Sequence, residues 1–290
     1  MSVPPGLLAA LVDDAGLFPP TSLPMDRAVE RHRADAEADA AMHTHRFLVP
    51  ASRVGEVRRL LREGEVFALG LIADRGAGNL AAAGAEIAAD PRLRLALVEA
   101  PLAAFGEEEA SALQALLAEL KDVPDHVPLY AEPVGRARPE PLLTELARRA
   151  GARPLGAKLR CGGVRADLFP GTGEVAGFVT ACVAAGVPFK ATAGLHEAVR
   201  HTSAATGFTH HGYLNLLLAT AVAASGGDRH AVRDVLETED AAELVRLAER
   251  LTAEEAVAAR RALVSYGSCS TAAPVREALR LFGPALRPTS

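Results

Sequence analysis

The chain has 290 residues, of which 49% are apolar, so it can bury a sizeable core and is not a disordered chain. Its formal net charge of −5, with no basic run interleaved with aromatics, argues against nucleic acid as a partner. Three cysteines without CxxC spacing exclude a disulfide framework and favour a cytoplasmic protein. The N-terminus lacks a signal-peptide pattern, and the longest apolar window, residues 214–224, is too short to span a bilayer, so we expect no membrane partner.

Short apolar runs that end in Gly, Pro or a polar residue alternate along the chain with longer helical patterns. The expected strands cover residues 46–49, 66–72, 94–98, 127–131, 155–159, 187–191, 231–236 and 262–266. The expected helices cover residues 53–62, 108–121, 141–150, 173–185, 214–224, 241–251, 252–263 and 273–281. Thr252 and Glu255 form a capping box at the start of one of these helices.

Strands that alternate with helices predict a parallel sheet with right-handed crossovers, and eight such units close into a barrel. We therefore predict an α/β protein with the (β/α)8 TIM-barrel fold, forming a single domain over residues 1–290. An N-terminal extension of helices and a loop takes up residues 1–41, and the barrel takes up residues 42–290. If the first or the seventh expected strand fails, an open doubly wound sheet is the alternative.

Two lysines lie at the ends of neighbouring expected strands, where barrel enzymes place their active sites. Because side chains alternate between the two faces of a strand, Lys158 and Arg160 share one face, and Lys190 and Thr192 share the equivalent face of the next strand. A second cation nearby lowers the pKa of an amine, and a neutral amine attacks carbonyl carbon. The sequence therefore predicts Lys158 and Lys190 as the centre of a catalytic site.

Further polar residues end the strands beside this pair. Tyr130 and Glu132 share the inward face of their strand, and Glu132 is a candidate proton shuttle or counter-ion for the lysines. Glu99 ends the preceding strand, where it either binds substrate or caps the next helix. His196 follows the second lysine strand and is a candidate general acid or base. His210 precedes a long apolar helix. It either caps this helix or reaches the site with its own side chain.

Glycine-containing loops are candidate anion sites at the barrel mouth. Gly163 and Gly194 follow the two lysine strands and leave backbone amides free, and Arg160 can bind a carboxylate or phosphate through two donors. The loop after the last strand is the usual phosphate site of this fold, although it can simply cap the following helix. The candidate residues in that loop are Ser268, Cys269 and Ser270.

Asp13 and Asp14 precede an apolar, proline-rich loop. If this segment folds over the barrel mouth, one carboxylate meets a lysine; otherwise the pair forms a helix cap and a turn. His43 and His45 form an HxH pair like that of metal-dependent amidohydrolases, but the pair precedes its strand instead of ending it. We expect no metal and no other cofactor.

Two resemblances follow from these motifs. The string FKATAGL, residues 189–195, resembles the Schiff-base lysine strand of class I aldolases of the deoxyribose-phosphate type, which hold a second lysine on a neighbouring strand. This resemblance implies an imine on Lys190, although in those aldolases the Schiff-base lysine comes first in the chain. The whole chain also resembles an actinobacterial TIM-barrel family of unassigned function, through residues 13–20, both lysine strings and residues 267–270. That second resemblance implies no particular reaction.

We therefore expect an aldolase-like lyase that acts on a small anionic carbonyl compound, phosphorylated or carboxylated, through a Schiff base on Lys190. Lys158 would assist the imine, Glu132 or His196 would move protons, and Arg160 with the Ser268 loop would hold the anionic end. The alternatives are an isomerase, decarboxylase or transferase that uses both lysines electrostatically, a metal-dependent hydrolase, and a non-catalytic barrel subunit. The apolar-rich surface favours a homodimer.

Overall fold

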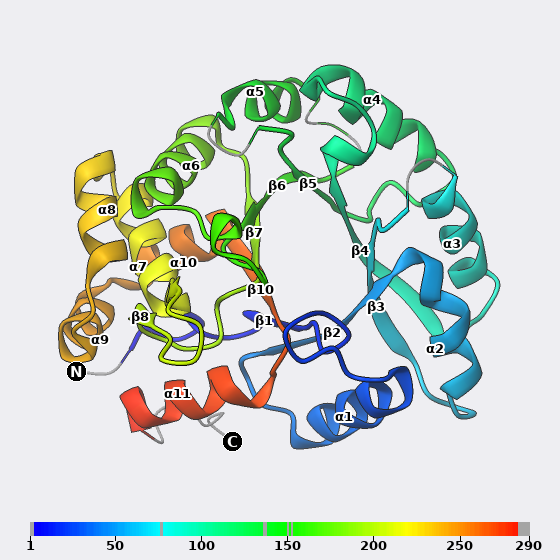
Figure 1. Ribbon diagram of the computed structural model, residues 1–290, viewed down its shortest axis with the longest axis horizontal. Helices are drawn as coiled ribbons and strands as arrows, with labels where there is room; N and C mark the ends of the chain where they lie inside the picture. The colour runs from blue at the N-terminus through cyan, green and yellow to red at the C-terminus, as the bar shows by residue number, and fades with distance from the viewer. Residues whose placement is uncertain (1–2, 76–77, 136–137, 150, 152, 284–290) are drawn as a thin grey trace.

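The computed structural model describes residues 3–75, 78–135, 138–149, 151 and 153–283. These residues form a closed barrel of parallel strands surrounded by helices (Figure 1), which is the predicted (β/α)8 TIM-barrel fold. The barrel strands are β1 (Val12–Asp14), β2 (His43–Pro50), β3 (Phe67–Ile72), β4 (Leu93–Pro101), β5 (Leu129–Glu132), β6 (Leu155–Arg160), β7 (Phe189–Thr192) and β10 (Leu263–Ser268).

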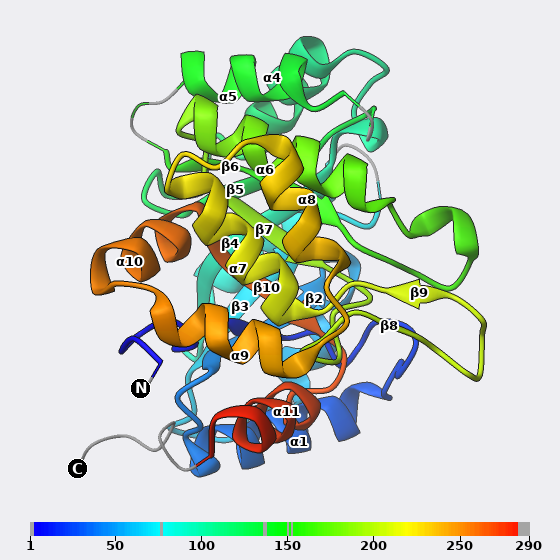
Figure 2. The ribbon, with the colours of Figure 1, turned by 90° about the vertical axis from the view of Figure 1, so that its left-hand side faces the viewer.

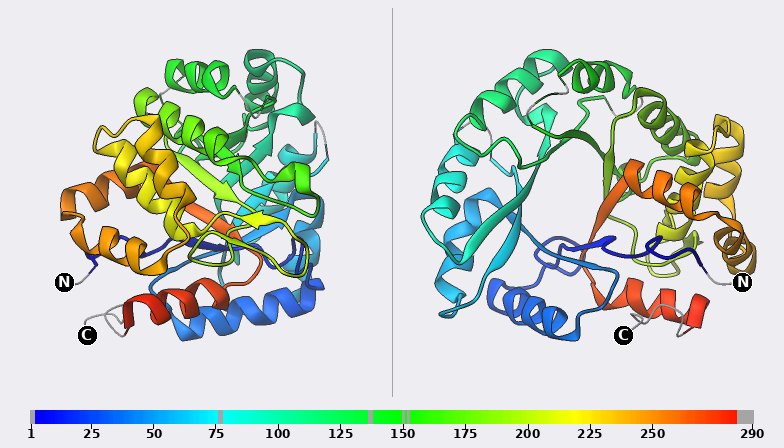
Figure 3. Two further views of the ribbon diagram at one scale, coloured as in Figure 1. Left: turned by 60° about the vertical axis from the view of Figure 1, so that its left-hand side comes forward. Right: turned by 180° about the vertical axis from the view of Figure 1, so that it is seen from behind.

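Helices form the outer layer, and Figure 3 shows them from behind as a ring around the barrel. They are α1 (Met25–Ala38), α2 (Val54–Leu60), α3 (Asn79–Ala88), α4 (Glu109–Glu119), α5 (Glu140–Arg148), α6 (Thr172–Ala185), α7 (Tyr213–Ala224), α8 (Arg229–Glu237), α9 (Ala241–Arg250), α10 (Ala253–Ala262) and α11 (Ala272–Phe282). Short 3-10 turns are η1 (Ala51–Arg53), η2 (Leu102–Ala104) and η3 (Ala166–Leu168). A small antiparallel pair, β8 (His201–Thr202) and β9 (Thr209–His210), projects on the same side as the loop after β1 (Figure 2).

The barrel closes through β1, which pairs in parallel with both β10 and β2. This strand has only three residues, too few for a period-two pattern to be recognised in the sequence. The barrel therefore begins earlier than the expected boundary at residue 42. The N-terminal extension is confined to the residues ahead of Val12.

The expected strand at residues 231–236 is wrong, because these residues belong to helix α8. The side chain of Asp228 accepts a hydrogen bond from the Ala231 backbone N–H and caps the helix. Val232, Val235 and Leu236 are buried at the three- and four-residue spacing of one helix face. The predicted number of eight strands was reached by counting this segment as a strand and omitting β1.

One apolar stretch among the described residues, Ala166–Ala185, is long and apolar enough to cross a membrane by length and composition alone. It covers η3 and α6, and one face of α6, with Val175, Phe178, Val179 and Cys182, is buried against the barrel. The ring of Phe178 packs edge-on against Phe189 of β7, with 5.6 Å between ring centroids. The buried face of α6 therefore packs within the outer helix layer of the barrel.

Candidate functional site

The two lysines predicted from strand parity share the barrel interior. Lys158 on β6 and Lys190 on β7 are direct register partners, so their side chains leave neighbouring strands on the same face. Their exposed fractions are only 4% and 0%. The adjacent Ala157 and Leu159 are buried on the opposite face, in the layer between sheet and helices.

Glu99 on β4 joins the two lysines. Its Oε2 atom lies 2.8 Å from Nζ of Lys158, and its Oε1 atom lies 2.8 Å from Nζ of Lys190. Asp13 contacts the far side of Lys190, and Glu132 lies 3.8 Å from Lys158. Burial opposes ionisation of Glu99, but the two lysines outweigh it and hold the pKa of this carboxyl at about 2. Carboxylate and lysine side chains therefore alternate across the barrel interior.

Asp13 is held by four donor side chains from three strands, β2, β7 and β10. Its Oδ1 atom accepts hydrogen bonds from Thr44 Oγ1 at 2.6 Å and Arg46 Nε at 2.7 Å, and its Oδ2 atom accepts them from Ser265 Oγ at 2.8 Å and from Lys190. Burial opposes ionisation, but the charges of Lys190 and Arg46 hold the pKa of Asp13 at about 2. Of the two acids singled out in the sequence, Asp13 is thus the one that meets a lysine.

Asp14 points the other way, toward helix α1. It pairs with Arg31, lies 3.1 Å from Nδ1 of His32, and accepts the backbone N–H of Gly16 at 3.0 Å. Burial opposes ionisation of Asp14, but the hydrogen bond with His32 and the charge of Arg31 keep its pKa below the ordinary value. Its contacts fix the loop after β1, and Asp14 does not reach the lysine pair.

Tyr130 lies one inward position deeper in the barrel than Glu132. Its ring centroid is 5.8 Å from Nζ of Lys190, within the range of a cation–π contact. Gly156 on β6 makes room for the ring, because a Cβ atom there would come within 2.6 Å of it. Burial raises the pKa of Tyr130 to about 12, so the phenol stays neutral. Tyr130 therefore lies deeper in the barrel than the lysine pair, where its ring packs against Lys190.

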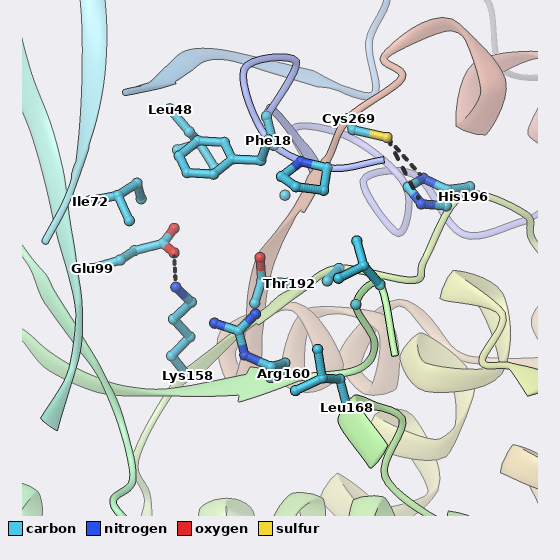
Figure 4. A pocket seen from close by; sticks show the side chains of 16 residues that line it. Phe18, Leu48, Ile72, Glu99, Lys158, Arg160, Leu168, Thr192, His196 and Cys269 are labelled. Carbon is cyan, nitrogen blue, oxygen red and sulfur yellow. Dashed lines mark hydrogen bonds and ion pairs between the residues drawn. The ribbon is translucent and has the colours of Figure 1, made fainter. Parts of the chain in front are cut away.

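A cavity of about 200 Å³ opens at the C-terminal ends of the strands. Its polar lining residues are Glu99, Lys158, Arg160, Thr192, His196 and Cys269, and its apolar lining residues include Ala15, Phe18, Pro19, Leu48, Ile72, Val164 and Leu168. Figure 4 shows Lys158 and Arg160 on one side of this cavity and Cys269 with His196 on another. Lys190 does not line the cavity and lies buried behind Glu99.

Arg160 is anchored so that part of its guanidinium remains at the cavity. Its Nε and Nη2 atoms donate to the two carboxylate oxygens of Glu132, at 2.8 and 3.2 Å, and 35% of the side chain is exposed. In the described ion-pair network, three carboxylates face four cationic side chains, so one positive charge remains for a bound anion. Those cations are Arg46, Lys158, Arg160 and Lys190.

The hydroxyls of the expected phosphate loop are used within the protein. Ser268 Oγ donates to the carbonyl of Ser270 at 2.7 Å, and Ser270 Oγ accepts the backbone N–H of Ala273 at 3.3 Å, at the start of α11. Both hydroxyls therefore make contacts within the loop and with the first turn of α11. From this loop, Gly267 and Cys269 reach the cavity.

The glycines expected to offer amides differ in position. Gly163 lines the cavity, whereas Gly194 turns the chain at the end of β7 with φ of +72°. A Cβ atom at Gly194 would come within 2.9 Å of the Cys161 carbonyl, so only glycine fits this close approach. This turn carries the chain to His196, which lines the cavity as predicted for a group near the mouth.

His210 belongs to the projecting β8–β9 pair and is not among the residues that line the cavity. Its ring stacks on His201, with centroids 5.1 Å apart, and contacts Phe169 at 4.8 Å. Burial and the neighbouring His201 lower the pKa of His210. A hydrogen bond with the Gly194 backbone also joins His210 to the turn after β7, so its expected role in substrate binding stays a prediction.

The HxH pair lies at the start of β2, at the end of the barrel opposite the cavity. His43 Nε2 lies 3.2 Å from the Thr271 carbonyl, and His45 pairs with Asp39. Within the described ranges, no cluster of three or more His, Cys, Asp or Glu residues is placed to hold a metal ion.

Several residues of the site were missed in the sequence. Arg46 and Leu48 occupy successive inward positions of β2, so the strand parity that revealed the lysines could also have revealed them. Phe18 lies on the loop after β1, where no periodic pattern indicates which side chains turn into the barrel.

No protein-family model, curated protein or solved structure matches this chain. The fold and the site therefore define the class of protein: a (β/α)8 barrel with a buried lysine pair and a small cavity at the C-terminal ends of its strands. Because this fold supports many reactions, the fold does not by itself specify the activity.

Proposed function

We propose that this protein is an enzyme, an aldolase-like lyase, that acts on a small anionic carbonyl compound through an imine on Lys158. The observation that carries the proposal is that Lys158 lines the cavity, with Nζ 2.8 Å from Glu99. The sequence favoured Lys190 for this role. The proposal exchanges the two lysines because Lys190 has an exposed fraction of 0% and stands behind Glu99.

The surroundings of Lys158 suit this chemistry. When the neutral amine adds to a carbonyl carbon and water leaves, the resulting iminium carries the same single positive charge as the ammonium. The pairing with Glu99 is therefore retained through the step. Lys190 keeps Glu99 ionised from its other oxygen, and Glu132, 3.8 Å from Nζ, is the carboxylate we assign to proton transfer.

The cavity wall indicates the kind of substrate. Arg160 and the surplus positive charge favour a carboxylate or phosphate at one end. Phe18, Leu48 and Ile72 form an apolar wall, which favours a hydrocarbon substituent at the other. A small 2-oxo acid with an apolar side chain has both features.

Borohydride trapping tests this proposal directly. Pyruvate, 4-methyl-2-oxopentanoate and acetaldehyde serve as probes, and the modified peptide is located by mass spectrometry. The chain contains only three lysines, Lys121, Lys158 and Lys190, so the assignment is unambiguous. We expect the adduct on Lys158, its loss in Lys158→Met, and its retention in the control Lys121→Met, at an exposed position. Absence of any Lys158 adduct with all three probes would contradict the imine.

A second candidate keeps Lys158 as an ammonium. Glu99 and Glu132 both lie beside Nζ, where they are counter-ions for the ammonium group. Such a cation would stabilise an enolate or a carboxylate electrostatically, as an isomerase, decarboxylase or transferase requires. This reaction would proceed without a trapped adduct. No contact in the described part of the chain favours the metal-dependent hydrolase or the non-catalytic subunit.

We also propose that the protein works in the cytoplasm, since its three cysteines are unpaired and a reducing compartment keeps them so. A homodimer and the absence of nucleic-acid partners stay predictions from composition.

A further inference from the structure

Cys269 and His196 meet on the wall of the cavity that faces Lys158 (Figure 4). The Sγ atom of Cys269 lies 3.7 Å from Nδ1 and 3.9 Å from Nε2 of His196. Cys269 directly follows β10 and His196 lies just beyond β7, and these two strands are neighbours in the barrel. Both side chains line the cavity, so a bound molecule can reach the sulfur.

The other groups around Cys269 favour a negatively charged sulfur. Thr21 on the loop after β1 donates its hydroxyl to Sγ at 2.9 Å, and Arg31 donates to the Cys269 carbonyl at 2.7 Å. Burial alone would raise the pKa of this thiol, but His196 and Thr21 outweigh it and bring the pKa below its ordinary value. A hydroxyl donor and an imidazole thus converge on one sulfur atom.

The two other cysteines provide a comparison within the same chain. Cys161 and Cys182 both have exposed fractions of 0% and face the layer between sheet and helices. Burial raises the pKa of Cys161 to about 12 and raises that of Cys182 still further. Unlike Cys269, neither lines the cavity.

We propose that Cys269 and His196 form a thiolate–imidazolium pair, a second reactive centre of the cavity that bonds covalently to small anionic electrophiles. The thiol proton passes to His196, and the thiolate forms a bond between Sγ and the electrophilic carbon. With a carbonyl ligand, the C=O π electrons move to oxygen, which takes the proton from His196 and completes a hemithioacetal. With a haloacetate, the halide leaves with the bonding electrons. Lys158 and Arg160 across the cavity attract the anionic end of the ligand.

Alkylation with iodoacetamide and iodoacetate, followed by mass mapping of the three cysteines, tests this inference without knowledge of the substrate. An ordinary thiol is only a few per cent ionised at pH 7. We therefore expect Cys269 to react at pH 7 about tenfold faster than an ordinary thiol. Its rate should level off at a lower pH than that of an ordinary thiol, while Cys161 and Cys182 stay unlabelled.

His196→Gln is the decisive variant. Its Cys269 should react about tenfold more slowly at pH 7 and recover at high pH, as expected of an unassisted thiol. His230→Gln, which changes an exposed histidine on α8, should leave the rate unchanged. Arg160→Gln should slow iodoacetate and spare iodoacetamide, because it removes a charge and not the thiolate.

Labelling of Cys161 or Cys182 would reveal any variant that has unfolded. In that case Thr21→Val, which removes only the hydroxyl donor, takes the place of His196→Gln and should also slow the reaction at pH 7. The proposal is overturned if Cys269 of the unaltered protein titrates like an ordinary thiol, or if the folded variant reacts at the unaltered rate. Borohydride trapping on Lys158 in Cys269→Ser reports on the imine separately, so the two proposals can fail independently.

Discussion

Lys158 and Lys190 are register partners on adjacent strands, and each places its Nζ atom 2.8 Å from a different oxygen of Glu99. One carboxylate thus serves two buried ammonium groups, of which only that of Lys158 reaches the cavity.

Replacing Glu99 by Gln should destabilise the fold strongly. The amide leaves two buried cations without their common counter-ion, and breaking a buried ion pair from one side costs about 3–5 kcal/mol. Urea unfolding followed by circular dichroism measures the change in unfolding free energy. Glu56→Gln, on the surface of α2, should change it by less than about 0.5 kcal/mol. A loss below about 1 kcal/mol in Glu99→Gln would show that the lysines are compensated in another way.

Stability should fall as the pH drops from about 4.5 to about 2. The pKa of Glu99 falls from 4.5 to about 2 on folding, and that of Asp13 from 3.8 to about 2. A carboxyl with a lowered folded pKa adds stability that is complete above its unfolded pKa and is lost as pH falls through its folded pKa. At 1.36 kcal/mol per pKa unit, the contribution is about 3 kcal/mol for Glu99 and about 2 kcal/mol for Asp13. Unfolding free energies between pH 7 and pH 2 should show this loss, and Glu99→Gln should show a shallower one.

Replacing Lys158 and replacing Lys190 should have different effects on stability and on borohydride trapping. Lys190→Met should destabilise the protein more than Lys158→Met, because Lys190 is fully buried and balances both Asp13 and Glu99. Lys158→Met should instead abolish borohydride trapping while the protein stays folded. Thermal unfolding and adduct yield, measured on both variants, test this division. Equal destabilisation together with trapping on Lys190 would reverse the assignment.

Gly156→Ala should disturb the layer below the lysines. The added methyl group would come within 2.6 Å of the Tyr130 ring and 2.7 Å of the Pro188 carbonyl, and such overpacking costs about 1–3 kcal/mol. Gly173→Ala in the first turn of α6 is the matched control, since its Cβ meets nothing within 4 Å and alanine favours a helix. Urea unfolding of both variants compares them. The prediction fails if the two changes have the same effect.

Arg160→Gln should weaken the binding of anionic ligands. Losing a charge-assisted hydrogen bond costs about 1.5–3 kcal/mol, which raises the concentration needed for half-maximal effect roughly 10- to 100-fold. The pyruvate dependence of borohydride trapping on Lys158 measures this shift, and the maximal yield should stay similar. Acetaldehyde, which has no anionic group, should show little change. A shift of the same size for acetaldehyde would point to a general disturbance of the cavity.

The sequence determined the alternation of strands and helices, and therefore the barrel. It also determined which side chains of β6 and β7 turn inward, because period-two parity is a property of each strand alone. Lys158, Arg160, Lys190 and Thr192 were assigned to the correct face in this way. The same local reasoning missed β1 and assigned residues 231–236 of α8 to a strand. Segments of three and six residues are too short for their periodicity to distinguish a strand from a helix or a loop.

Only the tertiary structure decided which of these residues meet. Asp13 and Lys190 are 177 positions apart, and His196 and Cys269 are 73 apart, yet each pair is in contact. These contacts exist because barrel closure sets β1 beside β10 and β10 beside β7. Closure depends on many weak long-range contacts formed together, and no local pattern records how deep each side chain comes to lie. That depth gives Lys158 access to the cavity and buries Lys190 behind Glu99.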